Sequence, residues 1–312
     1  MIYFAGTVAV KDSIFAGARC YIAARYQGRL LEQDQPVGLM TPPVAAIAPD
    51  EESVAPDKAR WRSVRRPLTT LIAILVGWEL LGRYVLTNHL FFAPLSEVAV
   101  AGVELWRSGE LQIHIWVSFS ELLEGVAAAI VFGIAVGIGI GISQRAREYS
   151  EIYITALYAT PLVAVTPLLI LWLGIGIVSK AAVVFLTAVF PILINTASGV
   201  RATDTQLIEV AQSFCATRAQ IIAKVMLPAA VPFMLTGIRL GIGRGIVGVV
   251  VGELFGARAG LGYLIFTSGQ TFDVPALFVG ILTLAAMGVG LTFAAQLVER
   301  RALRWRRAVD MD

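Results

Sequence analysis

The sequence predicts an all-α membrane protein with six transmembrane helices, and three observations support this fold class. First, 57% of the 312 residues are apolar and only 15% are charged, whereas a soluble domain carries about 25% charged residues. Second, six stretches are apolar over the ~20 residues that a helix needs to cross a bilayer. Third, most lysines and arginines gather between those stretches, which indicates the lipid bilayer as a partner rather than nucleic acid.

The ends of the chain differ from the apolar part. Acidic residues and prolines interrupt positions 1–57, so this segment cannot bury enough apolar surface to offset its ordering entropy. We expect a disordered or weakly helical N-terminal extension at 1–57, a transmembrane domain at 58–307 and a short tail at 308–312.

Six apolar stretches follow the basic run at 58–66 and make up the predicted spans. Their expected bounds are 68–86, 125–143, 152–173, 181–200, 228–256 and 276–298.

The distribution of basic residues predicts the orientation. Cytoplasmic segments of membrane proteins are enriched in Lys and Arg. Placing the basic run at 58–66 inside leaves only Arg83, Arg107, Lys180 and Arg258 in the outer segments. Both termini and the loop at 201–227 are therefore expected in the cytoplasm, as in a multi-pass protein of a bacterial inner membrane.

Glycines recur at four-residue spacing inside two of the predicted spans. Small residues at this spacing let helix backbones approach closely in lipid. The spacing leaves open whether the contacts lie within one subunit or between subunits. The glycines are Gly133, Gly137 and Gly141 in the second span, and Gly237, Gly241, Gly245, Gly248 and Gly252 in the fifth.

Few residues are available for a metal or a cofactor. The chain has two cysteines and two histidines, too few for a disulfide framework or a four-ligand zinc site. No cluster of His, Asp, Glu or Ser at one depth indicates a membrane-embedded enzyme. We therefore expect no catalytic site, no metal and no cofactor.

The cytoplasmic loop at 201–227 carries the most specific pattern. Thr203 with Gln206, and Thr217 with Gln220, each have the spacing of a capping box. They predict two short helices with a break near Cys215, the second bounded by Pro228.

The first of these helices has one apolar face. Leu207, Val210, Ala211 and Phe214 recur at the i, i+3, i+4, i+7 spacing of a helix face. A polar loop that keeps such a face is a candidate docking surface for a cytoplasmic partner.

The loop resembles the EAA loop of binding-protein-dependent ABC importer permeases, whose pattern is Glu-Ala-Ala, three residues, Gly, and later Leu-Pro. The resemblance extends from about residue 68 to the basic C-terminus. It is strongest toward permeases for nitrate, sulfonate, taurine and bicarbonate, through the segments 167–175 and 248–255. The residues that align with the pattern are Glu209, Val210, Ala211, Cys215, Ala216, Leu227 and Pro228.

Two of these residues depart from the pattern. Val210 replaces the first alanine and adds bulk to the docking face. Cys215 replaces the turn glycine, and a left-handed backbone at that position would cost about 1 kcal/mol.

The resemblance implies a type I ABC importer permease fold with a cytoplasmic coupling helix. It implies a homodimer that works with two cytoplasmic ATP-binding subunits and an extracytoplasmic substrate-binding protein. ATP hydrolysis then belongs to the separate subunit, and this chain is not an enzyme. The implied substrate is a small organic or inorganic anion such as an aliphatic sulfonate, taurine or nitrate. In this scheme Glu209 accepts hydrogen bonds or an ion pair from the ATPase or the adjoining helix; the alternative is a solvated loop carboxylate.

Three ionisable residues in the fifth span are candidates for the transport pathway. Arg239 and Arg244 lie deep in the predicted helix, where a charge usually faces protein or water. One of them is a candidate to attract an anion; the alternative is a partner such as Glu79 or helix C-terminal carbonyls. Glu253 is expected to be a structural partner or gate residue.

A self-sufficient secondary transporter or channel is the alternative function. Such a protein would be expected to carry internal repeats and ionisable residues in several spans. The second, third, fourth and sixth spans have no charged residue within their predicted bounds, which favours the importer subunit.

Overall fold

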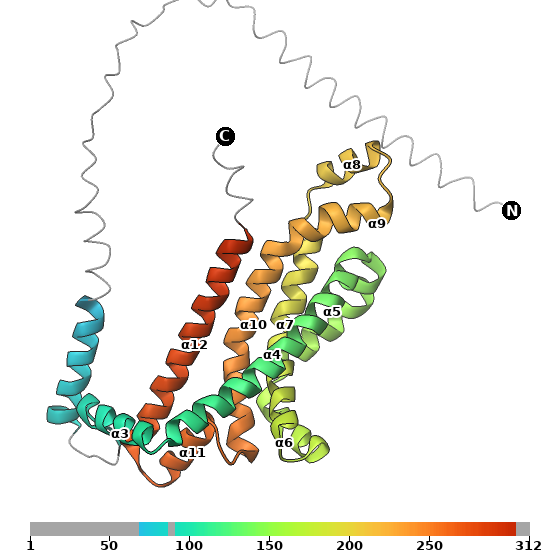
Figure 1. The fold of residues 1–312 in the computed structure, drawn as a ribbon. Coiled ribbons are helices and arrows are strands. Elements are labelled where there is room, and N and C mark those ends of the chain that lie inside the picture. Colours follow the sequence, from blue (N-terminus) through green and yellow to red (C-terminus); the bar gives the residue numbers. More distant parts are fainter. Residues whose placement is uncertain (1–68, 87–90, 304–312) are drawn as a thin grey trace, which may run out of the picture. The chain divides into compact units, whose positions relative to one another are not determined.

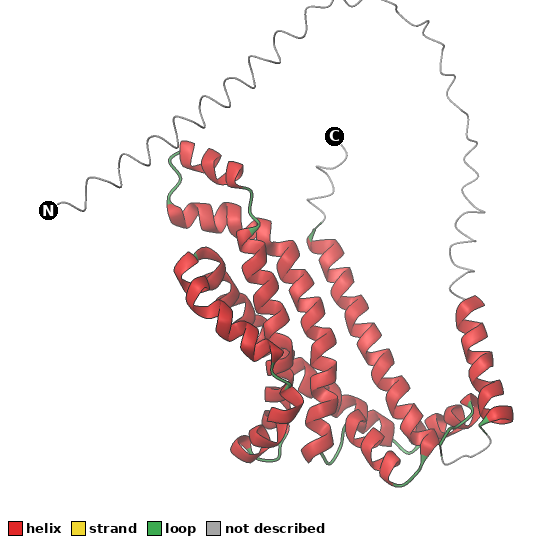
Figure 2. Ribbon diagram, turned by 180° about the vertical axis from the view of Figure 1, so that it is seen from behind, coloured by secondary structure: helices red, strands yellow, loops and turns green. Residues whose placement is uncertain are grey.

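The computed structural model describes residues 69–86 and 91–303. Within these residues every regular element is helical (Figure 2), which confirms the all-α fold class. The predictions for residues 1–57 and 308–312 lie outside the described residues.

Helices follow one another along the chain (Figure 1). Helical residues 69–80 run into a π-helical turn, η1, at Leu81–Val85. The later elements are α3 (Leu95–Arg107), α4 (Glu110–Ile142), α5 (Gln144–Ala159), α6 (Leu162–Leu173), α7 (Ile177–Arg201), α8 (Thr205–Ser213), α9 (Arg218–Ile221), η2 (Ile222–Met226), α10 (Leu227–Gly256), α11 (Leu261–Gln270) and α12 (Val274–Ala302).

Four helical segments in the described part of the chain are long and apolar enough to cross a membrane. They are α4, α7, the run from α9 through α10 at Arg218–Gly256, and α12, and they agree with the second, fourth, fifth and sixth predicted spans. The helix α4 begins at Glu110, well before the predicted start at residue 125. The start was predicted too late because charged residues such as Glu121 precede residue 125. In the structure Glu121 lies inside the helix bundle, where it forms an ion pair with Lys180 on α7.

The third predicted span, at 152–173, is not one continuous helix in the structure. Its residues lie in α5 and α6, which meet at a bend of 96°. Pro161 has no backbone N–H and disfavours a helical conformation at the residue before it. Thr160 accordingly has ψ 130°, and α5 ends there. Counted together as one broken span, the two helices would make a fifth crossing.

The described part of the first predicted span is helical over 69–80 and π-helical over Leu81–Val85. Its C-terminal half packs on the rest of the described chain through Trp78. The indole N–H of Trp78 donates to the Ala93 carbonyl at 3.0 Å, and its ring lies 5.1 Å from that of Phe278 on α12.

The main core forms where α7 packs along α4 and α10. Glycines make these contacts close, as the four-residue spacing predicts. A Cβ atom on Gly137 of α4 would lie 2.7 Å from Cβ of Thr196 on α7, and one on Gly241 of α10 would lie 2.9 Å from the Ile192 side chain of α7. These glycines therefore support packing within one subunit.

Candidate functional site

The loop at 201–227 contains the helix α8, whose start differs from the prediction. Asp204 is the N-cap, and its carboxylate accepts a hydrogen bond from the Gln206 N–H at 2.8 Å. The predicted capping box at Thr203 is therefore wrong. The Thr203 hydroxyl is buried and donates to the Val200 carbonyl at the end of α7, because a side chain one residue before the cap can reach back to the preceding helix.

The second capping box is confirmed at the start of α9. The Thr217 hydroxyl accepts from the Gln220 N–H at 3.4 Å, and the Gln220 side-chain oxygen accepts from the Thr217 N–H at 2.8 Å. The helix does not end at Pro228 as predicted, since it continues through η2 into α10. The π-helical turn, in which the Leu227 N–H donates to the Ile222 carbonyl, adjusts the backbone hydrogen bonding just before the proline.

The turn between α8 and α9 requires a left-handed residue, and Cys215 occupies that position with φ 56°. The Cys215 N–H donates to the Gln212 carbonyl at 2.8 Å, and the Ala216 N–H donates to the Ala211 carbonyl at 3.1 Å. This pair of bonds is a Schellman motif, in which the left-handed residue is usually glycine. The structure thus places Cys215 where the pattern has its glycine.

The apolar face of α8 is exposed. Leu207 and Val210 are each 54% exposed and Phe214 is 83% exposed. Ala211, on the same face, is half-buried, and Glu209 is exposed beside it. We call Leu207, Glu209, Val210 and Phe214 the α8 surface. Figure 1 shows α8 and α9 at the same end of the helices as the last turn of α12.

Leu227 and Pro228 lie apart from this surface. They form the first turn of α10 and are half-buried. They lie where the π-helical turn η2 passes into α10, so the helix continues past a proline that has no N–H to donate.

The two candidate pathway arginines have different surroundings. Arg239 forms an ion pair with Glu299 on α12 at 3.1 Å, so its partner is neither Glu79 nor a helix end. Glu79 instead pairs with Arg83 at 3.2 Å.

Arg244 is exposed and has no ion pair with any described residue. It borders a cavity of about 190 Å³ between the α5–α6 break, α7 and α10. Thr160 and Thr187 line the same cavity.

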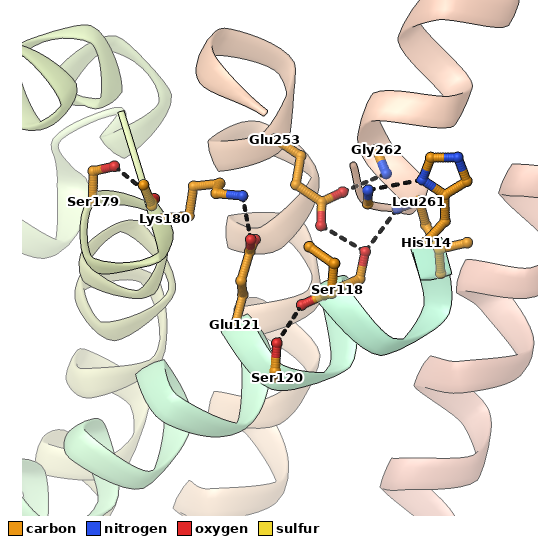
Figure 3. Close-up of polar contacts among 12 residues, drawn as sticks. His114, Ser118, Ser120, Glu121, Ser179, Lys180, Glu253, Leu261 and Gly262 are labelled. Carbon is orange, nitrogen blue, oxygen red and sulfur yellow. Dashed lines mark hydrogen bonds and ion pairs between the residues drawn. The ribbon is translucent and has the colours of Figure 1, made fainter. Parts of the chain in front are cut away.

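Glu253 lies in a buried polar cluster at the other end of α10 (Figure 3). Its side chain is 1% exposed. One carboxylate oxygen accepts from the Ser118 hydroxyl and the other from the Gly262 N–H, both at 2.5 Å. The Ser118 oxygen accepts in turn from the Leu261 N–H at 2.7 Å. Glu253 therefore connects α10 to α4 and to the start of α11.

The same cluster contains an ion pair between Glu121 of α4 and Lys180 of α7. Both residues are buried, and both interact electrostatically with Glu253. Close to it, His114 of α4 accepts a hydrogen bond from the Gly260 N–H at 2.9 Å. The polar cluster thus joins α4, α7, α10 and α11 inside the helix bundle.

Two glycines make room for the Glu253 carboxylate. A Cβ atom on Gly262 would lie 2.8 Å from a carboxylate oxygen. Gly260 has φ 131°, a backbone conformation that favours glycine, and also lies against Glu253.

Sequence reasoning found Glu253 but missed its partners. The second and fourth spans carry no charge within their predicted bounds, but both helices begin earlier than predicted, and the added turns contain Glu121 in α4 and Lys180 in α7. A helical pattern was present: His114, Ser118 and Glu121 are spaced at i, i+4 and i+7, which places them on one face of α4. No spacing in the sequence pairs this face with Lys180, which is distant along the chain.

The long apolar helices, the broken helix pair and the exposed α8 surface define a class of protein, the membrane-embedded transport permeases. Comparison with known families assigns the chain within that class. The family described as "Binding-protein-dependent transport system inner membrane component" matches residues 129–304. The chain belongs to this family and is the permease subunit of a binding-protein-dependent ABC importer, in which a separate subunit is the ATPase.

Three named relatives align with most of the chain. It is 34% identical to SsuC of Bacillus subtilis (strain 168) over 82% of this chain and 92% of SsuC. SsuC is named "Putative aliphatic sulfonates transport permease protein". It is 31% identical to the taurine transport permease TauC of Escherichia coli (strain K12), over 81% of this chain and 95% of TauC. It is 34% identical to the riboflavin transport permease RibX of Chloroflexus aurantiacus, over 85% of this chain and 98% of RibX.

A solved structure shares the fold. A chain of the inward-facing MetNI methionine ABC transporter aligns with a TM-score of 0.58 at 19% identity, over 64% of this chain and 98% of the MetNI chain.

Proposed function

We propose that this permease carries a small organic or inorganic anion, such as an aliphatic sulfonate, taurine or nitrate, and that α8 is its coupling helix. The relatives named for sulfonate and taurine transport support the substrate class. The relative named for riboflavin transport gives the alternative substrate class.

The single observation that carries the coupling role is the exposed α8 surface. Most of this apolar face is not covered by any described residue, since Leu207 and Val210 are more than half exposed and Phe214 at its C-terminal end is 83% exposed. Such a face is suited to bind a groove of a cytoplasmic ATPase subunit, in the way an amphipathic helix docks into a partner. Glu209 beside it would accept hydrogen bonds from the same partner.

The proposed assembly is a homodimer of the permease with two ATPase subunits and an extracytoplasmic substrate-binding protein. Each permease has six spans in the proposed topology, with both termini and α8 in the cytoplasm of a bacterial cell. The abundance of Lys and Arg at 58–66 and 300–307 supports this orientation. The first and the broken third span are the crossings that the topology adds to the four long apolar segments.

We further propose that Arg244, rather than Arg239, faces the pathway. Arg239 is neutralised by Glu299, whereas Arg244 borders a cavity beside Thr160 and Thr187. A guanidinium without a carboxylate partner attracts an anion over a short range and releases it again.

Reconstitution tests the proposed substrate class. The permease is placed in proteoliposomes with the ATPase and binding protein encoded beside it, and uptake of labelled taurine, an alkanesulfonate, nitrate and riboflavin is measured with and without ATP. We expect ATP-dependent uptake of at least one of the anions and none of riboflavin. Riboflavin uptake alone would contradict the anion assignment, and uptake without ATP or ATPase would favour a secondary transporter.

A further inference from the structure

A second cavity, separate from the proposed pathway, lies between α4, α5 and α7. Its volume is about 140 Å³. Buried Leu193 and Ala197 of α7 form its floor together with Ile140 and Ile154, and the exposed side chains of Arg201 and Glu151 lie at its mouth. The cavity therefore has an apolar interior and a charged opening.

Two guanidinium groups line this cavity: Arg147, whose ion pair with Glu151 is long, and Arg201, which has no carboxylate partner among the described residues. The Nε atom of Arg147 is buried and makes no hydrogen bond within the described chain. Its nearest carboxylate oxygen, on Glu151, is 3.8 Å away, which is too long for a hydrogen bond. Arg201 donates to the neutral Ser198 hydroxyl at 3.2 Å. Buried donors normally make a hydrogen bond, so the Nε of Arg147, which makes none, indicates a site for an additional acceptor.

We propose that this cavity binds a phosphate oxyanion, and that the bound form is the head group of an anionic phospholipid. Guanidinium groups suit phosphate because their planar donors match its oxygens. The hydroxyls of Ser150 and Thr155 on the same wall donate to backbone carbonyls of α5, so the two arginines are the donors for the phosphate oxygens. With Glu151 opposing two arginines, the cavity keeps a net positive charge.

The position of the cavity favours lipid over free phosphate. It lies near the end of α7 and the start of α5, at the end of the helices where α8 begins. The neighbouring Tyr149 and Tyr153 of α5 are 77% and 69% exposed, and tyrosines gather where a bilayer meets water. Basic pockets between helices on the cytoplasmic side bind anionic head groups, and the apolar floor gives an acyl chain a contact that free phosphate cannot use. The proposed topology decides only which leaflet of the bilayer supplies the lipid.

Native mass spectrometry of the full-length protein in detergent, with added phosphatidylglycerol or phosphatidylcholine, tests the proposal. We expect the unmodified protein to retain phosphatidylglycerol preferentially. The double variant Arg147→Gln/Arg201→Gln should bind it about tenfold more weakly, because each loss removes charge-assisted hydrogen bonds. Arg145→Gln is the matched control: Arg145 is an exposed arginine of α5 that does not line the cavity, so binding should be unchanged.

A folding defect in the double variant would also weaken lipid binding, so a second variant that is expected to strengthen binding is measured. Among the described residues that line the cavity, Glu151 is the only carboxylate, so Glu151→Gln should bind phosphatidylglycerol more tightly. Equal retention by the unmodified protein, the double variant and Glu151→Gln would overturn the site. If inorganic phosphate raises the unfolding temperature of the unmodified protein but not of the double variant, while phosphatidylglycerol does neither, the lipid assignment is overturned and the oxyanion site stands for the free anion.

Discussion

Cys215 shows how one residue can meet the geometry of a family pattern without the residue type that suits it. The turn after α8 closes with both hydrogen bonds of a Schellman motif, and Cys215 adopts the left-handed conformation with φ 56°. A side chain in this conformation is strained by about 1 kcal/mol. The pattern of the EAA loop predicted this position because the two hydrogen bonds of the turn require a left-handed backbone there, whichever side chain the residue carries.

Replacing Cys215 by glycine should therefore stabilise the protein. For Cys215→Gly we expect the free energy of unfolding to rise by about 1 kcal/mol, since glycine adopts the left-handed conformation without steric cost. Cys215→Ala is the control and should change little, because alanine keeps the strain. Chemical denaturation in detergent measures both, and equal stability of the glycine and alanine variants would refute the strain.

The buried pair of Glu121 and Lys180 permits a second residue-scale prediction. Lys180→Met leaves the Glu121 carboxylate buried without its cation and should lower the free energy of unfolding by about 3 kcal/mol. The double variant Glu121→Leu/Lys180→Met removes both charges and should recover most of that loss. Unfolding in detergent compares the two. If the double variant is as unstable as Lys180→Met, the pair has no specific stabilising role.

Arg239 and Arg244 should respond differently to the loss of their charge. Arg244→Gln should lower the initial rate of anion uptake about tenfold, the effect of removing an attraction of about 1.4 kcal/mol. Arg239→Gln should leave the rate largely unchanged and lower stability by about 1 kcal/mol, because a partly exposed ion pair with Glu299 contributes little. Uptake that depends on Arg239 and not on Arg244 would contradict the proposed pathway.

At the scale of helices, the length of the apolar stretches predicted the four long membrane-spanning segments. The residues at which these segments begin could not be predicted from the apolar pattern alone. The ends of α4 and α7 depend on tertiary contacts: Glu121 and Lys180 look like span boundaries in the sequence but neutralise each other inside the bundle. The α5–α6 break follows from Pro161, which the sequence displays, but a proline also occurs inside α6 and α7 without ending them. Local chemistry therefore indicates where a helix can break, and packing decides whether it does.

The glycine-lined contact between α4 and α7 gives a prediction with an internal control. A Cβ atom on Gly137 would lie 2.7 Å from Cβ of Thr196, whereas one on Gly139 would meet nothing within 4 Å. Gly137→Ala should lower the free energy of unfolding by about 1–3 kcal/mol through overpacking. Gly139→Ala should be neutral or stabilising by about 0.5 kcal/mol, since alanine favours a helix. Equal effects at both positions would show that the close approach does not limit stability.

At the scale of the whole molecule, the α8 surface lies beyond the packed helices and is the part of the fold least explained by internal packing. The sequence identified it because an amphipathic pattern inside a polar loop is a local signal. It could not identify the polar cluster around Glu253, whose members come from four helices far apart in the chain. We expect that cluster to hold the end of the bundle opposite α8 together while the ATPase subunits act at α8.

The central claim is that α8 transmits the action of the ATPase, and ATP hydrolysis coupled to anion uptake in proteoliposomes tests it most directly. Phe214→Glu, or Glu209→Ala combined with Val210→Glu, should abolish coupled hydrolysis and uptake while the exposed sites leave folding intact. Gln212→Glu is the matched control: Gln212 is an exposed polar residue of α8 outside the α8 surface, and coupling should survive. Coupled hydrolysis and uptake that persist in the α8-surface variants at the level of the control would contradict the account.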